Sequence, residues 1–360
     1  MLQSKYLRTC LSIIATLLII YLSYKVNFLF IPLVSIFNLL LVPIVLSGFL
    51  FYLLRPIVNY LDHRKMNRSL AILLIYFVFA GLIALFFILV WPTLQEQIST
   101  FIQNTPSLME DLQKQLNKYQ NNRFLSRIIP TQSEITANIS NYVNRLISVV
   151  TDSIANLVTV VSNVVIVLAT IPIILYYMLK ESNKLAPKVL HLLPRRYRKD
   201  GKEVCEEIDS AISNFIVGRV ILNLILGVMM YIGFLIIGLP YALLLALISA
   251  ILNLIPYIGA LLATVPVVIV ALTVSPTIAF WSLIIIIITQ QIQDNILSPI
   301  IYGKQLDIHP LTTVILLLIG ADFYGLMGVI LAIPAYMIVK IIVVRIYGLF
   351  LSEKIEEIIE

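Results

Sequence analysis

Long apolar runs separated by short polar segments dominate this sequence. A helix needs about 20 apolar residues to cross roughly 30 Å of hydrocarbon. Runs of that length cover about residues 7–24, 28–54, 69–92, 154–179 and 216–237, and the region 241–345 is also apolar. The pattern therefore predicts an all-α polytopic integral membrane protein with seven or eight transmembrane helices.

The apolar region 241–345 is interrupted at 255–259, 290–299 and 320–325. No water is available in hydrocarbon to satisfy freed backbone groups, so a broken helix persists only where it lines a cavity or is buried in protein. The breaks therefore predict a transport pathway near the bilayer midplane. Full spans and re-entrant hairpins both fit the stretches 241–274 and 311–345. The residues expected to break the helices are Pro256, Gly259, Pro299, Gly303, Gly320, Gly325, Gly328 and Pro334.

Composition and charge exclude a soluble domain. Only 12% of the 360 residues are charged and the mean hydropathy is +0.99, whereas roughly a quarter of the residues are charged in a soluble protein. The net charge of +6 comes mainly from loops between spans, where it is an orientation signal rather than a sign of nucleic-acid binding. The basic loops at 55–68 and 180–202 are therefore predicted to be cytosolic. This orientation places both termini in the cytosol and the segment 93–153 outside.

These signals divide the chain into five parts. We expect a three-helix membrane scaffold over 1–92, an external helical segment over 93–153, a fourth membrane helix with a basic cytosolic loop over 154–202, a transport bundle over 203–345 and an acidic tail over 346–360. The scaffold is expected to contact other subunits of a homo-oligomer.

Two local predictions concern helix boundaries. Thr105 followed by Pro106 is typical of a helix start within the external segment. The apolar face of 203–215 predicts a helix lying along the cytosolic membrane surface, which would turn into the next span at Gly218 and Arg219.

Asp294 is the strongest candidate for ion or substrate binding. It closely follows the apolar run 284–288, and a charged side chain at the bilayer centre costs about 2.5–3.5 kcal/mol on insertion scales. A carboxyl held there could exchange a proton for a cation. The alternative is a structural role, in which Asp294 is paired with Arg219 or Lys304.

Amide side chains surround this carboxyl. Gln290, Gln291 and Asn295 lie at helical spacing around Asp294 and could hold a hydroxylated ligand or an ion. Interhelical hydrogen bonding without a ligand is the competing interpretation for them, and also for Asn223 and Asn253.

Two further charged residues have competing interpretations. Arg219 either extends to the membrane surface or contacts the substrate. Asp322, within the third break, is a further candidate site residue.

The sequence does not indicate an enzyme. No nucleophile with a base, no phosphate-binding loop and no set of His or Cys at metal-ligand spacing is present. We therefore expect no catalytic residues, no bound metal and no cofactor. Ion or proton gradients are the expected energy source, with H⁺ or Na⁺ as possible coupling ions.

A family resemblance rests on the order and spacing of motifs over the C-terminal third. The motifs are Pro256-Tyr257-Ile258-Gly259, Asp294-Asn295 with Pro299 and Gly303-Lys304, His309-Pro310, Gly320 with Gly325 and Gly328, and Leu331-Ala332-Ile333-Pro334. Together they resemble the autoinducer-2 exporter family of bacterial transporters. The resemblance implies export of the quorum signal autoinducer-2 or, as in some family members, sodium or lithium/proton antiport.

We therefore expect a secondary transporter of the bacterial cytoplasmic membrane. It would export a small polar solute resembling autoinducer-2 by alternating access, with ion or proton coupling. One alternative is a sodium(lithium)/proton antiporter, and another is a non-transporting membrane scaffold. The expected partners are the lipid bilayer, a small-molecule or cation substrate and further copies of the chain.

Overall fold

The computed structural model describes residues 27–120, 161–191, 193–256, 258–302 and 308–359, together with five isolated positions between 14 and 25. Every regular element in these ranges is a helix, which confirms the predicted all-α class. Helices long and apolar enough to cross a membrane cover Leu39–His63, Arg68–Leu89, Arg195–Ile236, Pro276–Tyr302 and Met327–Gly348. The predicted span 7–24 and the beginning of 154–179 lie largely outside the described residues.

Three helices form a first packed group: α2 (Asn27–His63), α3 (Arg68–Leu89) and α6 (Val161–His191). Their shared core contains Phe51, Leu54, Val58, Ala71, Ile72, Ile75, Leu175 and Leu179. Arg68 at the start of α3 donates from Nε to the Leu179 carbonyl at 2.8 Å and from Nη2 to Ser182 Oγ at 2.6 Å. Arg68 therefore links the end of the basic segment 55–68 to the start of the basic segment 180–202.

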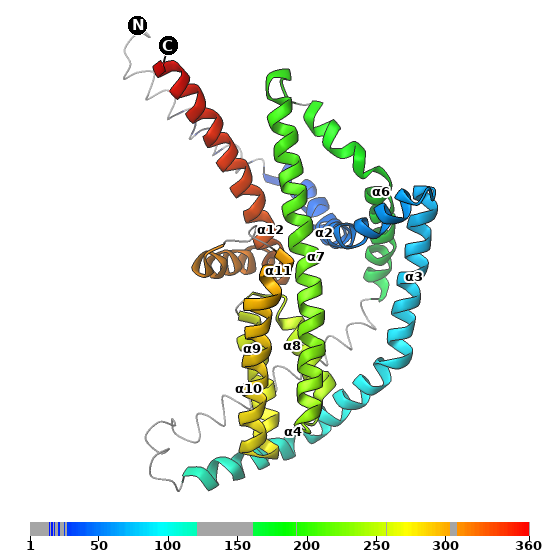
Figure 1. The fold of residues 1–360 in the computed structure, drawn as a ribbon, viewed down its shortest axis with the longest axis vertical. Helices are drawn as coiled ribbons and strands as arrows, with labels where there is room; N and C mark the ends of the chain where they lie inside the picture. Colours follow the sequence, from blue (N-terminus) through cyan, green and yellow to red (C-terminus); the bar gives the residue numbers. More distant parts are fainter. Residues whose placement is uncertain are drawn as a thin grey trace.

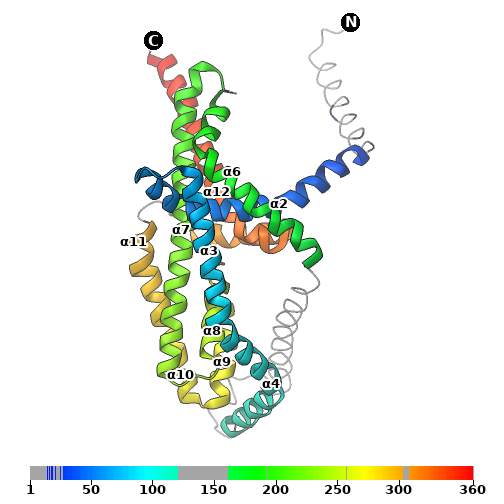
Figure 2. The same cartoon turned by 90° about the vertical axis from the view of Figure 1, so that its right-hand side faces the viewer.

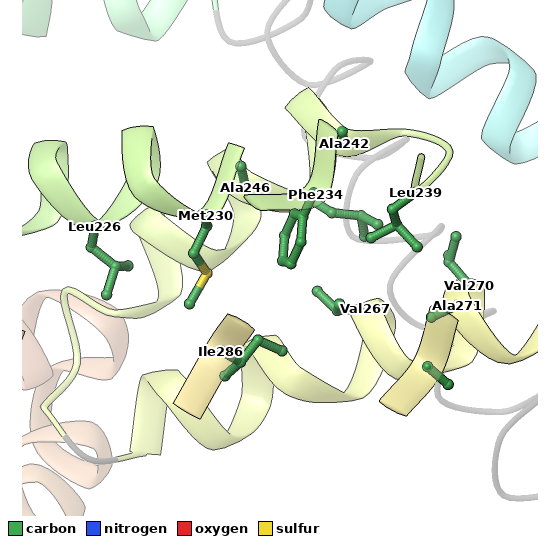
Figure 3. Close-up of a cluster of buried hydrophobic side chains, with 12 residues drawn as sticks. Leu226, Met230, Phe234, Leu239, Ala242, Ala246, Val267, Val270, Ala271 and Ile286 are labelled. Atoms are coloured by element: carbon green, nitrogen blue, oxygen red, sulfur yellow. The ribbon is translucent and has the colours of Figure 1, made fainter. Parts of the chain in front are cut away.

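The second group is built on α7 (Arg198–Ile236), a long helix that runs through the centre of the molecule (Figure 1). Beside its C-terminal half lie α8 (Ala242–Leu252), α9 (Ile258–Val274) and α10 (Pro276–Ile292). Figure 3 shows Met230 and Phe234 of α7 facing Val267 of α9 and Ile286 of α10. Because lipid tails are as apolar as these side chains, close packing rather than exclusion of water holds such helices together.

The predicted turn at Gly218 and Arg219 is wrong, because α7 is continuous from Arg198 to Ile236. Gly218 instead allows close packing. An added Cβ would lie 2.5 Å from Tyr302 Cε1 and 2.8 Å from Ile301 Cγ2, so a side chain at this position would push the neighbouring helix away.

An ion pair joins the two packed groups. The guanidinium of Arg55 on α2 donates through Nη1 and Nη2 to the two carboxylate oxygens of Asp209 on α7, both at 2.7 Å. Paired donors matched to a carboxylate fix the relative orientation of the two side chains as well as their distance. The contact therefore holds α2 against the N-terminal half of α7.

The helix α4 (Trp91–Gln120) crosses beneath the ends of α8, α9 and α10 (Figures 1 and 2). It continues through Pro106, so the predicted helix start at Thr105 is wrong. Within a helix, proline removes one backbone hydrogen bond and clashes with the carbonyl four residues earlier, which kinks or breaks the helix; α4 is not broken at Pro106. The rest of the segment 93–153, from residue 121 onward, lies outside the described residues.

Contacts to the bundle hold α4 in place before this proline. Gln97 Oε1 accepts the backbone N–H of Leu244 at 3.0 Å, and Asn104 Nδ2 donates to the Tyr241 hydroxyl at 3.1 Å. Phe101 packs edge-on against the Tyr241 ring with 5.4 Å between ring centroids. The polar segment after α3 is thus attached to the bundle that begins at α7.

The chain turns at the first and third predicted breaks. α8 ends at Leu252 and α9 begins at Ile258. An added Cβ at Gly259 of α9 would lie 1.9 Å from the Leu252 carbonyl oxygen, so the two helices approach closely at the turn. The helix α12 (Pro310–Ile359) consists of two arms that meet at Tyr324 and Gly325, and Gly325 has a φ of 56°. The arms Ala242–Leu252 and Pro310–Gly325 are shorter than the roughly 20 residues needed to cross a bilayer. Ile258–Val274 is also short, whereas the second arm of α12, Met327–Gly348, is long enough to cross a membrane.

The second predicted break is not an unwound segment, so that prediction is wrong. α10 continues through a π-helical turn, η3 (Gln293–Leu297), into α11 (Ser298–Tyr302). The Ser298 N–H donates to the Gln293 carbonyl, five residues earlier rather than four. A π turn of this kind widens the helix without ending it, and such turns are frequent at functional sites.

Candidate functional site

A cavity of about 460 Å³ lies where four parts of the C-terminal region meet. Its walls come from α7, the turn between α8 and α9, the continuous α10–η3–α11 segment and both arms of α12. The polar residues that line it are Arg219, Asn253, Gln290, Gln293, Asp294, Ser298, Tyr302 and Thr313. Its volume falls within the usual 300–1,000 Å³ of small-molecule sites.

Asn253 is the centre of the hydrogen-bond network in this region. Its Nδ2 donates to Asn223 Oδ1 and to Gln293 Oε1, each at 3.0 Å. The three amide side chains are 3%, 6% and 3% exposed for Asn253, Asn223 and Gln293. The network therefore joins α7, the α8–α9 turn and η3 within the protein interior.

The backbone of Asn253 takes part as well. The last carbonyls of a helix have no partner within that helix, and Asn253 is the residue at which α8 ends. Arg219 Nη2 donates to the Asn253 carbonyl oxygen. Arg219 therefore lines the cavity, where its guanidinium is bound to the turn between α8 and α9.

Helical spacing places part of the predicted amide cluster on the cavity and part elsewhere. Gln290, Gln293 and Asp294 share one helix face because they are three and four residues apart, and all three line the cavity. Gln291 and Asn295 occupy the next face, where both are exposed and Asn295 Nδ2 donates to Gln291 Oε1. The structure does not bring these two residues to the cavity.

Two opposite charges lie on the cavity wall. Asp294 is an exposed residue that lines the cavity, which places its carboxylate where the cavity opens. The guanidinium of Arg219 is close enough to interact electrostatically with both Asp294 and Tyr302. The site therefore offers a carboxylate, a guanidinium, a phenol and several amides to a bound solute.

Asp322 lies outside this cavity. It is exposed near the tip of the α12 hairpin, whereas Thr313 and Ile333, farther along the two arms, line the cavity. At 1.5 Å per helical residue, the tip is roughly 12–16 Å from those two residues. The hairpin thus presents its open end to the cavity and carries Asp322 away from it.

The helix-breaking residues have different positions. Pro256 lines the cavity, and Pro334 lines a neighbouring apolar one. Gly320 and Gly328 contact each other across the α12 hairpin. Pro299 is exposed in α11, and Gly303 lies outside the described residues.

Four polar residues of the cavity were missing from the sequence-based set: Gln293, Ser298, Tyr302 and Thr313. The spacing of Gln293 from Gln290 was a usable signal, since it places both on one helix face. Thr313 is buried against the cavity by the folding of the α12 hairpin, and no local pattern indicates this. Among the residues that the structure describes, no group of three metal-ligating side chains is present.

Comparison with known proteins identifies the family. The sequence model of the AI-2E family transporter matches residues 11–348. The chain belongs to the AI-2E transporter family. This finding confirms the resemblance noted in the C-terminal motifs and establishes the chain as a multi-pass membrane transporter.

Several relatives are similar over most of their length. "Putative transport protein YueF" of Bacillus subtilis is 34% identical over 364 residues, which cover 99% of this chain and 98% of the relative. "Putative transport protein YrrI" of the same organism is 30% identical, with 91% and 93% covered. "Putative permease PerM" of Escherichia coli is 30% identical, with 85% and 87% covered. The AI-2E family match therefore extends over the membrane helices and the cavity alike.

Proposed function

We propose that this AI-2E family transporter exports a small polar solute across the bacterial cytoplasmic membrane by alternating access, coupled to an ion or proton gradient. The observation that carries the proposal is the polar cavity bounded by four separate chain segments. Polar side chains within membrane segments are expensive and tend to mark substrate or ion pathways. A solute bound among segments that can move relative to one another can be released to either side.

Unpartnered donors in the cavity wall support binding of an oxygen-bearing solute. Two amide donors are buried without a hydrogen-bond partner among the described residues. One is Gln290 Nε2 in the cavity wall, and the other is Asn223 Nδ2 in the network around Asn253. A buried donor without a partner costs about 1–3 kcal/mol. A hydroxyl or carbonyl oxygen of the solute at Gln290 would remove that penalty.

Sodium(lithium)/proton antiport is the second candidate, and the Asp294 carboxylate favours it. A carboxylate is a ligand for hard cations and also a proton acceptor. Competition between a cation and a proton for this one carboxylate couples their movements across the membrane. The remaining alternative, a non-transporting scaffold, has no support from the relatives named above, all of which are named for transport.

The test compares two carboxylates in purified protein reconstituted into liposomes. Asp294→Asn removes the charge from the cavity, whereas Asp322→Asn removes one from the hairpin tip outside it. Loss of a charged hydrogen bond is worth about 1.5–3 kcal/mol, or roughly tenfold to hundredfold in rate. We expect a loss of that size for Asp294→Asn and parent-like transport for Asp322→Asn.

Two readouts separate the candidates. Efflux of autoinducer-2 from loaded vesicles reports solute export, and a pH-sensitive dye reports proton movement when sodium or lithium is added. Dye response without solute efflux would favour antiport over solute export. Equal rates for the parent and Asp294→Asn in both assays would show that this cavity is not the transport site.

A further inference from the structure

A second cavity, of about 390 Å³, lies between the N-terminal helix group and the transport bundle. Its walls are contributed by α2, α7, α12 and the turn between α8 and α9, and they consist mostly of aliphatic and aromatic side chains. Representative members are Phe49 of α2, Ile212 and Ile216 of α7, and Ile330 and Ile338 of α12. Water needs two to four polar partners to occupy a site, so this lining is suited to hydrocarbon instead.

The apolar cavity adjoins the polar one. Phe215, Arg219, Pro256 and Ile333 line both. Arg219 is the charged residue of this shared wall, and its guanidinium has a planar array of donors that matches carboxylate or phosphate oxygens. An apolar cavity with a permanent positive charge at its boundary is complementary to an anionic amphiphile, which has a hydrocarbon chain and a negatively charged head.

We propose that the apolar cavity binds a single hydrocarbon chain of an amphiphile whose negatively charged, oxygen-bearing head lies at Arg219. The polar side of the head then faces the amide donor of Gln290 in the neighbouring cavity. This site goes beyond the export of a small polar solute and does not depend on it. The amphiphile can come from the bilayer as a lipid or from the cell as a transported solute, and both sources share this chemistry.

A larger side chain at position 48 would fill part of the apolar cavity. Gly48 lines that cavity, and an added Cβ at this position meets no atom within 4 Å. A leucine at position 48 can therefore enter the chain compartment without displacing backbone. Gly81 of α3 is the matched control, because it is also a membrane-helix glycine with nothing within 4 Å, and it lines neither cavity.

The experiment uses the full chain in nanodiscs of zwitterionic phosphatidylcholine. The probe is dodecyl phosphate with a photoreactive diazirine near the end of its chain, and labelled peptides are mapped by mass spectrometry. We expect saturable labelling in 45–52 of α2 and 327–338 of α12. Overpacking costs about 1–3 kcal/mol, so Gly48→Leu should lower this labelling about fivefold to hundredfold, whereas Gly81→Leu should leave it unchanged.

The head group is tested separately. A probe with the same chain and a trimethylammonium head should label these segments about tenfold less, as should the phosphate probe on Arg219→Gln, because a charged hydrogen bond is lost in each case. These two measurements still test the proposal if Gly48→Leu does not fold. Equal labelling by both heads, or equal labelling of Gly48→Leu and Gly81→Leu, would overturn it.

Competition identifies the source of the amphiphile. If phosphatidylglycerol in the nanodisc displaces the probe at a lower mole fraction than unlabelled dodecyl phosphate, the occupant is a bilayer lipid. The reverse order identifies a single-chain solute. Displacement by neither would contradict a specific site. Failure of the chain site leaves the Asp294→Asn transport result unaffected, so the two proposals can fail independently.

Discussion

The contact between Gly320 and Gly328 predicts a large effect for Gly328→Ala, a change of one methyl group. The two glycines lie on opposite arms of the α12 hairpin. An alanine Cβ at position 328 would lie 1.8 Å from the Gly320 carbonyl oxygen and 2.6 Å from its carbonyl carbon. Both atoms belong to the backbone, so no side-chain rotation can relieve the overlap.

The size of the effect follows from this geometry. Close carbon–oxygen contacts in proteins are about 3.3–3.6 Å, so the arms must separate by roughly 1.5 Å at this point. Overpacking of this kind typically costs about 1–3 kcal/mol. Separation of the arms also displaces Thr313 and Ile333, which line the polar cavity from the two arms. We therefore expect Gly328→Ala to lower both stability and transport rate.

The control is Gly348→Ala on the same helix, where an added Cβ meets nothing within 4 Å. Alanine stabilises the interior of a helix by roughly 0.5–1 kcal/mol relative to glycine. Both positions lie in helical parts of α12, so both variants gain this stabilisation and only Gly328→Ala has the clash. Thermal unfolding of the detergent-purified proteins should give a clearly lower Tm for Gly328→Ala. Equal melting temperatures and equal transport would refute the close approach of the two arms.

Two further contacts lead to predictions. In a double-mutant cycle, Arg55→Ala and Asp209→Ala should show a coupling of about 1–3 kcal/mol in the free energy of unfolding, because two charge-assisted hydrogen bonds join these residues. Additive effects of the two substitutions would contradict the ion pair. Gln97→Ala should speed hydrogen exchange of the Leu244 amide about fivefold, as expected for a lost hydrogen bond of about 1 kcal/mol. Gln95→Ala, on the same helix but exposed, is its control.

Much of the fold could be predicted because hydrocarbon imposes simple rules on a sequence. Span length and backbone satisfaction alone indicated the all-α class and the long spans at α2, α3 and α7. The turn at Gly218 was predicted wrongly because a glycine required for packing against Tyr302 has the same local appearance as one required for a turn. Only the neighbouring helix distinguishes the two, and it is distant in sequence.

The candidate site was partly predictable for a related reason. Asp294, Arg219 and Asn253 are polar residues in apolar surroundings, and all three line the cavity. Asp322 shares that property but lies at the exposed tip of the hairpin. The sequence indicates which residues have a high free-energy cost of insertion into a membrane. It does not indicate toward which compartment a hairpin directs them, because tertiary packing decides this.

Irregular backbone alone does not mark the site, as a comparison of the three predicted breaks shows. The turn after α8 exposes the Asn253 carbonyl, which Arg219 from α7 satisfies. The π turn brings Gln293 to the same network, where it accepts a hydrogen bond from Asn253. At the tip of α12, by contrast, the chain reverses direction through the positive φ of Gly325 and the close contact between Gly320 and Gly328, which are features of the backbone and involve no side chain from another helix. Breaks whose polar groups are satisfied by side chains from other helices therefore build the cavity, since those same side chains can exchange their partners for a solute.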